Sequence, residues 1–244
     1  MMNHSKKVFR MVFLAMMVAI GVVISPILRV EGMCPTAHLI NIVCAVLMGP
    51  WYALLCATLI GIIRMSMMGI PPLALTGAVF GAFLSGVLYR ASKGKLICAV
   101  IGEVVGTGII GAIVSYPVMT FLVHKEGLTW LFYVPSFLCG TLIGGSVAFV
   151  FLRQLARAGV LPRFQRMLSD QSFEEGSSVL SNAAAIAALG VIGYLLIKIL
   201  TGMVFRTADP LWNWAAWGVI ALFLIAALVY FLVHRSGKRV EVHE

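Results

Sequence analysis

The stretch from Gly102 to Pro117 reads GEVVGTGIIGAIVSYP, and it decides the fold because it places a single acid inside a long apolar run. That run extends from Leu96 to Val123 between charged residues, and it is long enough to cross a bilayer as a helix. Glu103 lies about seven residues from its start, which is about 10 Å deep in an α-helix. Since a charge is costly in lipid, the acid should face a bundle interior or a wet cavity.

The helical repeat distributes the residues of this stretch over three faces. At about 100° per residue, Glu103, Thr107, Ile110 and Val114 share one face. On one side of it lie Gly102 and Gly106, and on the other Gly108, Gly111, Ala112 and Ser115. Small residues let helices approach closely, so we expect a central helix packed on two sides. Two interpretations of Glu103 remain open: a ligand contact, or an acid held neutral or hydrogen-bonded within the bundle.

The composition is that of a polytopic membrane protein. Of 244 residues, 61% are hydrophobic and 11% are charged, and the mean hydropathy is +1.03. A soluble domain would have about twice that charged fraction. The net charge of +9 does not indicate nucleic-acid binding, because the positive residues lie between apolar spans. The five cysteines form no CxxC pair, and they indicate buried apolar positions rather than disulfides or a metal site.

Apolar runs predict an all-α membrane fold of eight spans, in which a six-helix bundle is followed by a two-helix hairpin. The second span is short and fits only if it is tilted, partly buried by its neighbours or extended by its loops. The spans are 8–27, 36–48, 50–68, 73–89, 96–123, 130–152, 179–200 and 211–233.

Three domains follow from a change in composition after the sixth span. They are a six-span bundle over 1–155, a basic cytoplasmic linker over 156–178 with some amphipathic surface helix, and a hairpin with a basic tail over 179–244. The first apolar run is longer than a signal-peptide core and no A-x-A site follows it, so we expect an uncleaved span.

The distribution of positive charge orients the chain. With the N-terminus inside, thirteen Lys and Arg residues lie on the inner side, and both termini are cytoplasmic. Five lie on the outer side: Arg29, Arg64, Lys125, Lys198 and Arg206.

No catalytic or metal-binding motif is present. The chain lacks GxxxxGK[ST], HExxH and His/Cys ligand spacings, so we expect no catalytic residue, no metal, no cofactor and no enzyme activity. A few polar residues remain in an apolar bundle, which is how small-molecule sites are usually built. The candidate binding residues are His38, Asn41, Arg64, Glu103, Thr107, Tyr133 and Phe137; Tyr116 and Ser136 complete the sparse polar set.

Several of these candidates keep a second interpretation. Arg64 either faces the site or extends outward to the interface. Its depth differs from that of Glu103 by about 10 Å, so a bridging ligand or water is favoured over a direct ion pair. Tyr133 and Phe137 form either a stacking wall for a flat ligand or plain packing.

The motifs resemble those of the ThiW family of substrate-binding S components of energy-coupling factor (ECF) transporters, over about residues 8 to 155. The matching pieces are Ala15-x-x-x-Ala19, His38-x-x-Asn41, Gly49-Pro50-Trp51, Arg64, Gly102-Glu103-x-x-Gly106-Thr107-Gly108, Ser115-Tyr116-Pro117 and Pro135-Ser136-Phe137. The turn over 69–77 and the hairpin beyond about residue 170 depart from the family pattern.

The resemblance implies uptake of the thiazole precursor of thiamine, a hydroxyethyl-methylthiazole, across a bacterial cell membrane. Ala15 and Ala19 would dock onto a membrane T component coupled to two ATP-binding subunits, which hydrolyse the ATP. This chain would only bind substrate, through hydrogen bonds to the hydroxyl and ring nitrogen and stacking on the ring. The alternatives are an S component for the pyrimidine half of thiamine or another vitamin, a solitary secondary transporter, and a membrane scaffold without a ligand.

Overall fold

The computed structural model describes residues 2–27, 34–169, 171–173, 178–199, 201 and 210–240, with side chains except at 2–4, 27, 199 and 235–240. Some sequence-based expectations lie outside these residues. They concern the outer-side residues Arg29 and Arg206, the part of the linker at 170 and 174–177, and the side chains of the basic tail from residue 235 onward.

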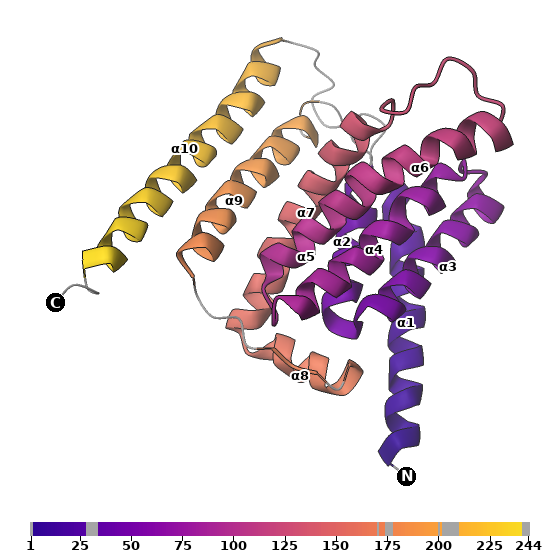
Figure 1. The fold of residues 1–244 in the computed structure, drawn as a ribbon, viewed down its shortest axis with the longest axis horizontal. Helices are drawn as coiled ribbons and strands as arrows, with labels where there is room; N and C mark the ends of the chain where they lie inside the picture. The colour runs from indigo at the N-terminus through magenta and orange to yellow at the C-terminus, as the bar shows by residue number, and fades with distance from the viewer. Residues whose placement is uncertain are drawn as a thin grey trace. The chain divides into compact units, whose positions relative to one another are not determined.

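Every regular element in the described part of the chain is a helix (Figure 1). The elements are α1 (Met2–Ile27), α2 (Pro35–Met48), α3 (Pro50–Met68), α4 (Leu73–Ala91), α5 (Leu96–Glu103), the π-helix η1 (Val104–Gly111), α6 (Ala112–Pro117), the π-helix η2 (Val118–Leu122), α7 (Val134–Arg157), α8 (Val160–Leu168), α9 (Val179–Ile199) and α10 (Pro210–Val240).

Within the described ranges, seven helical segments are long and apolar enough to cross a membrane, and α2 is a shorter apolar helix. The all-helical, polytopic fold is therefore confirmed. The division into six spans plus two and the cytoplasmic placement of both termini stay predictions.

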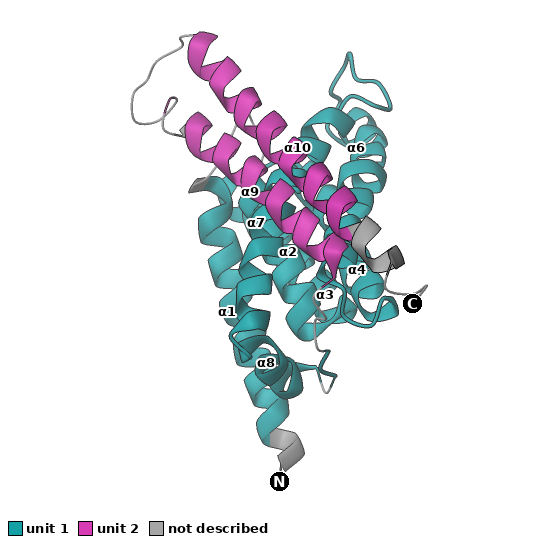
Figure 2. Ribbon diagram, turned by 90° about the vertical axis from the view of Figure 1, so that its left-hand side faces the viewer, with its two compact units in different colours: residues 1–175 teal, residues 176–244 magenta. Residues whose placement is uncertain are grey.

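The chain forms two compact units, residues 1–175 and residues 176–244 (Figure 2). In the second unit α9 and α10 pair as a hairpin, as expected. Their contact includes a hydrogen bond of 3.0 Å from Asn182 Nδ2 to Tyr230 Oη. The rings of Tyr194 and Trp217 pack with their centroids 5.2 Å apart.

In the first unit, the short helix α2 is the most enclosed element. It packs against α1, α3, α4, α5, α7 and α8, and most of its 14 residues are buried. A helix of this length spans only about 21 Å, less than a hydrocarbon core. Its shortness is tolerated because neighbouring helices surround it, which is one of the three explanations open from the sequence.

The Glu103 segment is a continuous helical rod from Leu96 to Leu122 that includes the two π-helical sections. It packs closely on α4 through glycines. A Cβ on Gly102 or Gly106 would lie 2.6 Å from backbone atoms of α4, and one on Gly111 would lie 2.6 Å from the carbonyl oxygen of Gly77. The rod is thus packed on α4, on α7 and, around Glu103, on α2, while its remaining face is exposed.

Three positions on this rod differ from the regular-helix expectation. Gly111 and Ser115 lie on the α4 side with Gly102 and Gly106, rather than on the opposite side: Ser115 Oγ is 2.7 Å from Thr76 Oγ1 of α4. Ile110 is 40% exposed, although the expectation placed it on the face of Glu103. These deviations follow from η1, because i→i+5 bonding turns the chain less per residue than an α-helix does.

The predicted linker contains α8, which lies across one end of the bundle (Figure 1). Its Gln165 is buried, and Nε2 donates to the Val46 carbonyl at 3.0 Å and to Tyr89 Oη at 2.9 Å. Arg163 and Arg166 remain exposed on the same helix. The expected amphipathic helix is therefore present, and it packs against α1, α2 and α7, while Gln165 reaches Tyr89 of α4.

The glycine contact between η1 and α4 gives a stability prediction. In Gly106→Ala the new methyl group would meet the backbone of Gly81 and Phe80, which cannot rotate away. We expect a loss of about 1–3 kcal/mol in unfolding free energy, as for other overpacked cores, measured by unfolding in detergent. Gly218→Ala is the control, since its Cβ would enter open space. Equal stability of the two variants would contradict the close contact.

Candidate functional site

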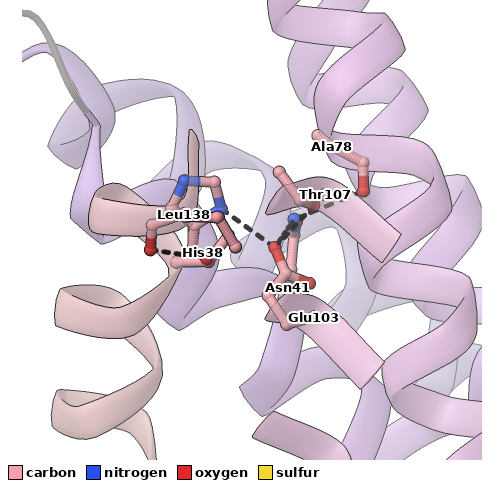
Figure 3. A network of polar contacts seen from close by, with 7 residues as sticks. His38, Asn41, Ala78, Glu103, Thr107 and Leu138 are labelled. Atoms are coloured by element: carbon pink, nitrogen blue, oxygen red, sulfur yellow. Dashed lines mark hydrogen bonds and ion pairs between the residues drawn. The ribbon is translucent and has the colours of Figure 1, made fainter. Parts of the chain in front are cut away.

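The site is centred on Glu103, whose side chain is fully buried at 0% exposure. Three groups meet its Oε1 (Figure 3): His38 Nδ1 at 2.9 Å, Asn41 Nδ2 at 3.0 Å and Thr107 Oγ1 at 3.0 Å. Asn41 Nδ2 also lies 3.4 Å from the Ala78 carbonyl of α4. The acid therefore connects α2 with its own helix, as the interpretation of a hydrogen-bonded acid within the bundle requires.

Helical spacing places each of these partners. His38 and Asn41 are three residues apart on α2, and Glu103 and Thr107 are four apart where α5 passes into η1, so each pair shares a helix face. Close packing then brings the two faces together. Gly144 of α7 contributes, because a Cβ there would lie 2.8 Å from His38 Cβ.

The second carboxylate oxygen, Oε2, is buried without a hydrogen-bond partner in the described structure. It faces Gly81 of α4, where a Cβ would lie 2.7 Å from Oε2 and would also meet Thr107 Oγ1. Gly81 is therefore required for the acid to fit against α4.

A cavity of about 90 Å³ adjoins this network. Helices α2, α3, α4, α7 and η1 contribute to its walls, together with the turn that precedes α4. The lining residues are Cys34, Ala37, His38, Arg64, Ile70, Leu73, Ala74, Gly77, Ala78, Thr107, Ser136, Phe137 and Gly140. Four of the seven candidates, His38, Arg64, Thr107 and Phe137, thus line one cavity, while Glu103 and Asn41 lie directly behind His38 and Thr107.

Arg64 faces the cavity and does not extend outward, since its side chain is only 4% exposed. Its Nη2 lies 3.6 Å from Cys34 Sγ, and its Nε is buried without a partner in the described structure. No ion pair joins it to Glu103 among the described residues. Among the described residues, the guanidinium of Arg64 contacts only this thiol, so its buried positive charge is poorly compensated. Its N–H groups can therefore donate to a ligand.

The aromatic candidates occupy two layers. Phe137 lines the cavity, and a Cβ on Gly77 would lie 2.7 Å from its Cε2, so glycine leaves room for the ring. Tyr133 lies behind it with a ring-centroid distance of 5.9 Å, in a cluster with Ala112 and Met119. The structure thus places Phe137, but not Tyr133, against the cavity.

Sequence reasoning missed most of the apolar wall. Ala37, Ala74, Gly77 and Ala78 carry no chemical signal. Cys34 was missed as well, because it lies just before α2, where helical spacing does not fix the direction of a side chain. The described residues contain no group of three or more His, Cys, Asp or Glu side chains that could hold a metal ion.

The arrangement can hold a small polar molecule in a defined orientation. Beside the cavity lie an imidazole fixed by a buried acid, a guanidinium with free donors, and an aromatic ring against small residues. Few polar groups in an apolar, aromatic wall are typical of small-molecule sites.

Comparison with known proteins places these features in a family. The family model described as "Thiamine-precursor transporter protein (ThiW)" matches residues 11–158, more than half of the chain. The matched region includes every residue of the site and ends before α9. No curated protein and no solved structure matches the chain.

The bond from Thr107 to Glu103 can be tested by two substitutions of different chemistry. Thr107→Val keeps the shape but removes the donor, so we expect a loss of about 1.5–3 kcal/mol, the range for hydrogen bonds to charged groups. Thr107→Ser keeps the hydroxyl and should lose less. Unfolding of the ligand-free protein in detergent measures both, and equal losses would mean that this hydrogen bond is unimportant.

Proposed function

Because the chain belongs to the ThiW family of thiamine-precursor transporter proteins, we propose that it is the substrate-binding S component of an ECF transporter that imports hydroxyethyl-methylthiazole. The family is one of transporters, so the chain is a multi-pass membrane transporter and not an enzyme. A bacterial cell membrane fits this assignment.

The observation that carries the proposal is the cavity between His38, Arg64 and Phe137. His38 and Arg64 would hydrogen-bond the hydroxyl group and the ring nitrogen of the thiazole, and Phe137 would stack on its flat ring. Glu103, Asn41 and Thr107 would hold the polar wall in place, and Tyr133 would support Phe137 from behind.

The size of the cavity supports a small substrate. Its volume is about 90 Å³, whereas pockets for drug-sized ligands have about 300–1,000 Å³. A single ring with a short side chain suits this space better than a complete two-ring vitamin does. A precursor is therefore the favoured cargo.

A second feature supports docking onto a membrane partner. An almost wholly apolar groove lies between α1 and α3, lined by Met11, Leu14, Ala15, Val18, Ala19, Val22, Val23, Leu59 and Ile63. Ala15 and Ala19 are exposed in it, and small residues permit close approach of another helix. We assign this groove to a T component, which would couple the chain to two ATP-binding subunits that hydrolyse the ATP.

Binding tests the substrate assignment. The purified protein should be stabilised by hydroxyethyl-methylthiazole, and Arg64→Met should weaken binding at least about tenfold, because a bond from a charged donor is worth about 1.5–3 kcal/mol. Titration calorimetry measures the affinity. Arg163→Met is the control, since Arg163 is exposed on α8 and away from the cavity.

Other outcomes would change the assignment. Binding of the hydroxymethyl-pyrimidine half of thiamine and of no thiazole would make the chain an S component for that precursor. Uptake by the chain alone, without an ATP-binding partner, would make it a secondary transporter. No binding of any small molecule would leave a membrane scaffold.

Docking makes a separate prediction. Ala15→Trp would fill the groove, so uptake by cells that contain the partner subunits should be abolished while substrate binding by the purified protein is unchanged. Val12→Trp is the control, because Val12 is 61% exposed on α1 but does not line the groove. If binding fell together with uptake, the groove would not be a docking surface.

A further inference from the structure

The hydrogen bonds around Glu103 indicate which of the two ring nitrogens of His38 carries a proton. Asn41 Nδ2 can only donate, and it donates to Oε1, as Thr107 Oγ1 does. The simplest pattern that satisfies all three contacts has Oε1 accepting each of them, with His38 Nδ1, 2.9 Å away, as the third donor.

The other ring nitrogen of His38 is then the polar atom offered to the cavity. Figure 3 shows it turned away from Glu103. His38 lines the cavity and its side chain is 12% exposed, and Nε2 has no partner in the described structure. If Nδ1 carries the proton of a neutral ring, Nε2 presents a lone pair and must receive a hydrogen bond.

The cavity wall holds few groups that could pair with a charged ligand. Arg64 is a buried cation on the wall, and the carboxyl group of Glu103 lies behind His38, where its Oε1 is taken up by three hydrogen bonds. Among the described residues that line the cavity, the remaining titratable groups are His38 and Cys34. A cationic ligand would meet Arg64 and no acidic residue of the lining, so its charge would be uncompensated in a low-dielectric site.

We infer that the site accepts an uncharged molecule that donates a hydrogen bond to His38 Nε2 and accepts one from Arg64, with Glu103 as the positioning residue that fixes the tautomer of His38. Cys34, which contacts Arg64, lies just before α2, and His38 lies in its first turns, so the two polar groups border the same end of this helix and line one cavity. This inference rests on the proposed function and narrows the choice of substrate. The free alcohol, hydroxyethyl-methylthiazole, is bound, whereas its phosphate ester and the cationic vitamin are excluded from the site.

Nitrogen NMR of the ligand-free protein tests the tautomer without reference to any substrate. In protein labelled with ¹⁵N-histidine at pH 8, where an ordinary imidazole is neutral, His38 should show a protonated Nδ1 and an unprotonated Nε2. Its signals are identified by their loss in His38→Gln. Glu103→Gln should produce a mixture of both neutral tautomers, because a neutral amide holds Nδ1–H less strongly than a carboxylate does. A doubly protonated ring, an Nε2–H tautomer, or an unchanged spectrum in Glu103→Gln would overturn the inference.

A ligand series tests the polarity of the cavity. Calorimetry with hydroxyethyl-methylthiazole, its methyl ether and its phosphate monoester should give affinities at least about 100-fold lower for the ether and the ester, because unpaired polar groups at a dedicated site reject such analogues strongly. An ether that binds within threefold of the alcohol, or an ester that binds more tightly, would refute the inference. If none of the three binds, the proposed function fails, and the NMR result still decides the tautomer.

Discussion

The hydrogen bonds from His38, Asn41 and Thr107 to one oxygen of Glu103 are the interaction on which the bundle depends. A carboxylate in a low-dielectric interior is tolerated only when its charge is solvated by fixed donors. Two of these donors come from α2, so the hydrogen bonds to Glu103 can form only when α2 lies beside the helix that carries the acid. The same contact that makes the acid tolerable also holds His38 at the cavity wall.

Small residues make this contact sterically possible. Gly102 and Gly106 bring the acid's helix against the α4 backbone, and Gly81 leaves the space that Oε2 and Thr107 occupy. In lipid there is little hydrophobic driving force between helices, so close packing and internal hydrogen bonds must supply the association. The close contacts at the glycines and the hydrogen bonds of the buried acid therefore depend on each other. The glycines let the helices approach, and this approach lets the acid form its hydrogen bonds.

Spacing within one helix could be predicted from the sequence, and relations between helices could not. The pairs His38/Asn41 and Glu103/Thr107 follow from a 3.6-residue repeat, but nothing local states that the two pairs meet. The predicted side of the helix for Gly111 was wrong, because η1 interrupts the regular repeat. Arg64 kept two interpretations, since a position near a helix end suits an interfacial cation as well as a cavity lining. The alanines of the wall cannot be recognised from the sequence, because they contribute only the space that a larger side chain would fill.

Helix α3 connects the two surfaces that the proposed transport cycle needs. Leu59 and Ile63 line the apolar groove beside α1, and the next residue, Arg64, lines the cavity. Adjacent residues on a helix point about 100° apart, so one segment serves both surfaces without sharing a side chain. A partner helix that displaced Ile63 would move Arg64 as well, because the helix backbone is rigid over a single turn. Docking on the groove and retention of a ligand by Arg64 would then be coupled through α3 itself.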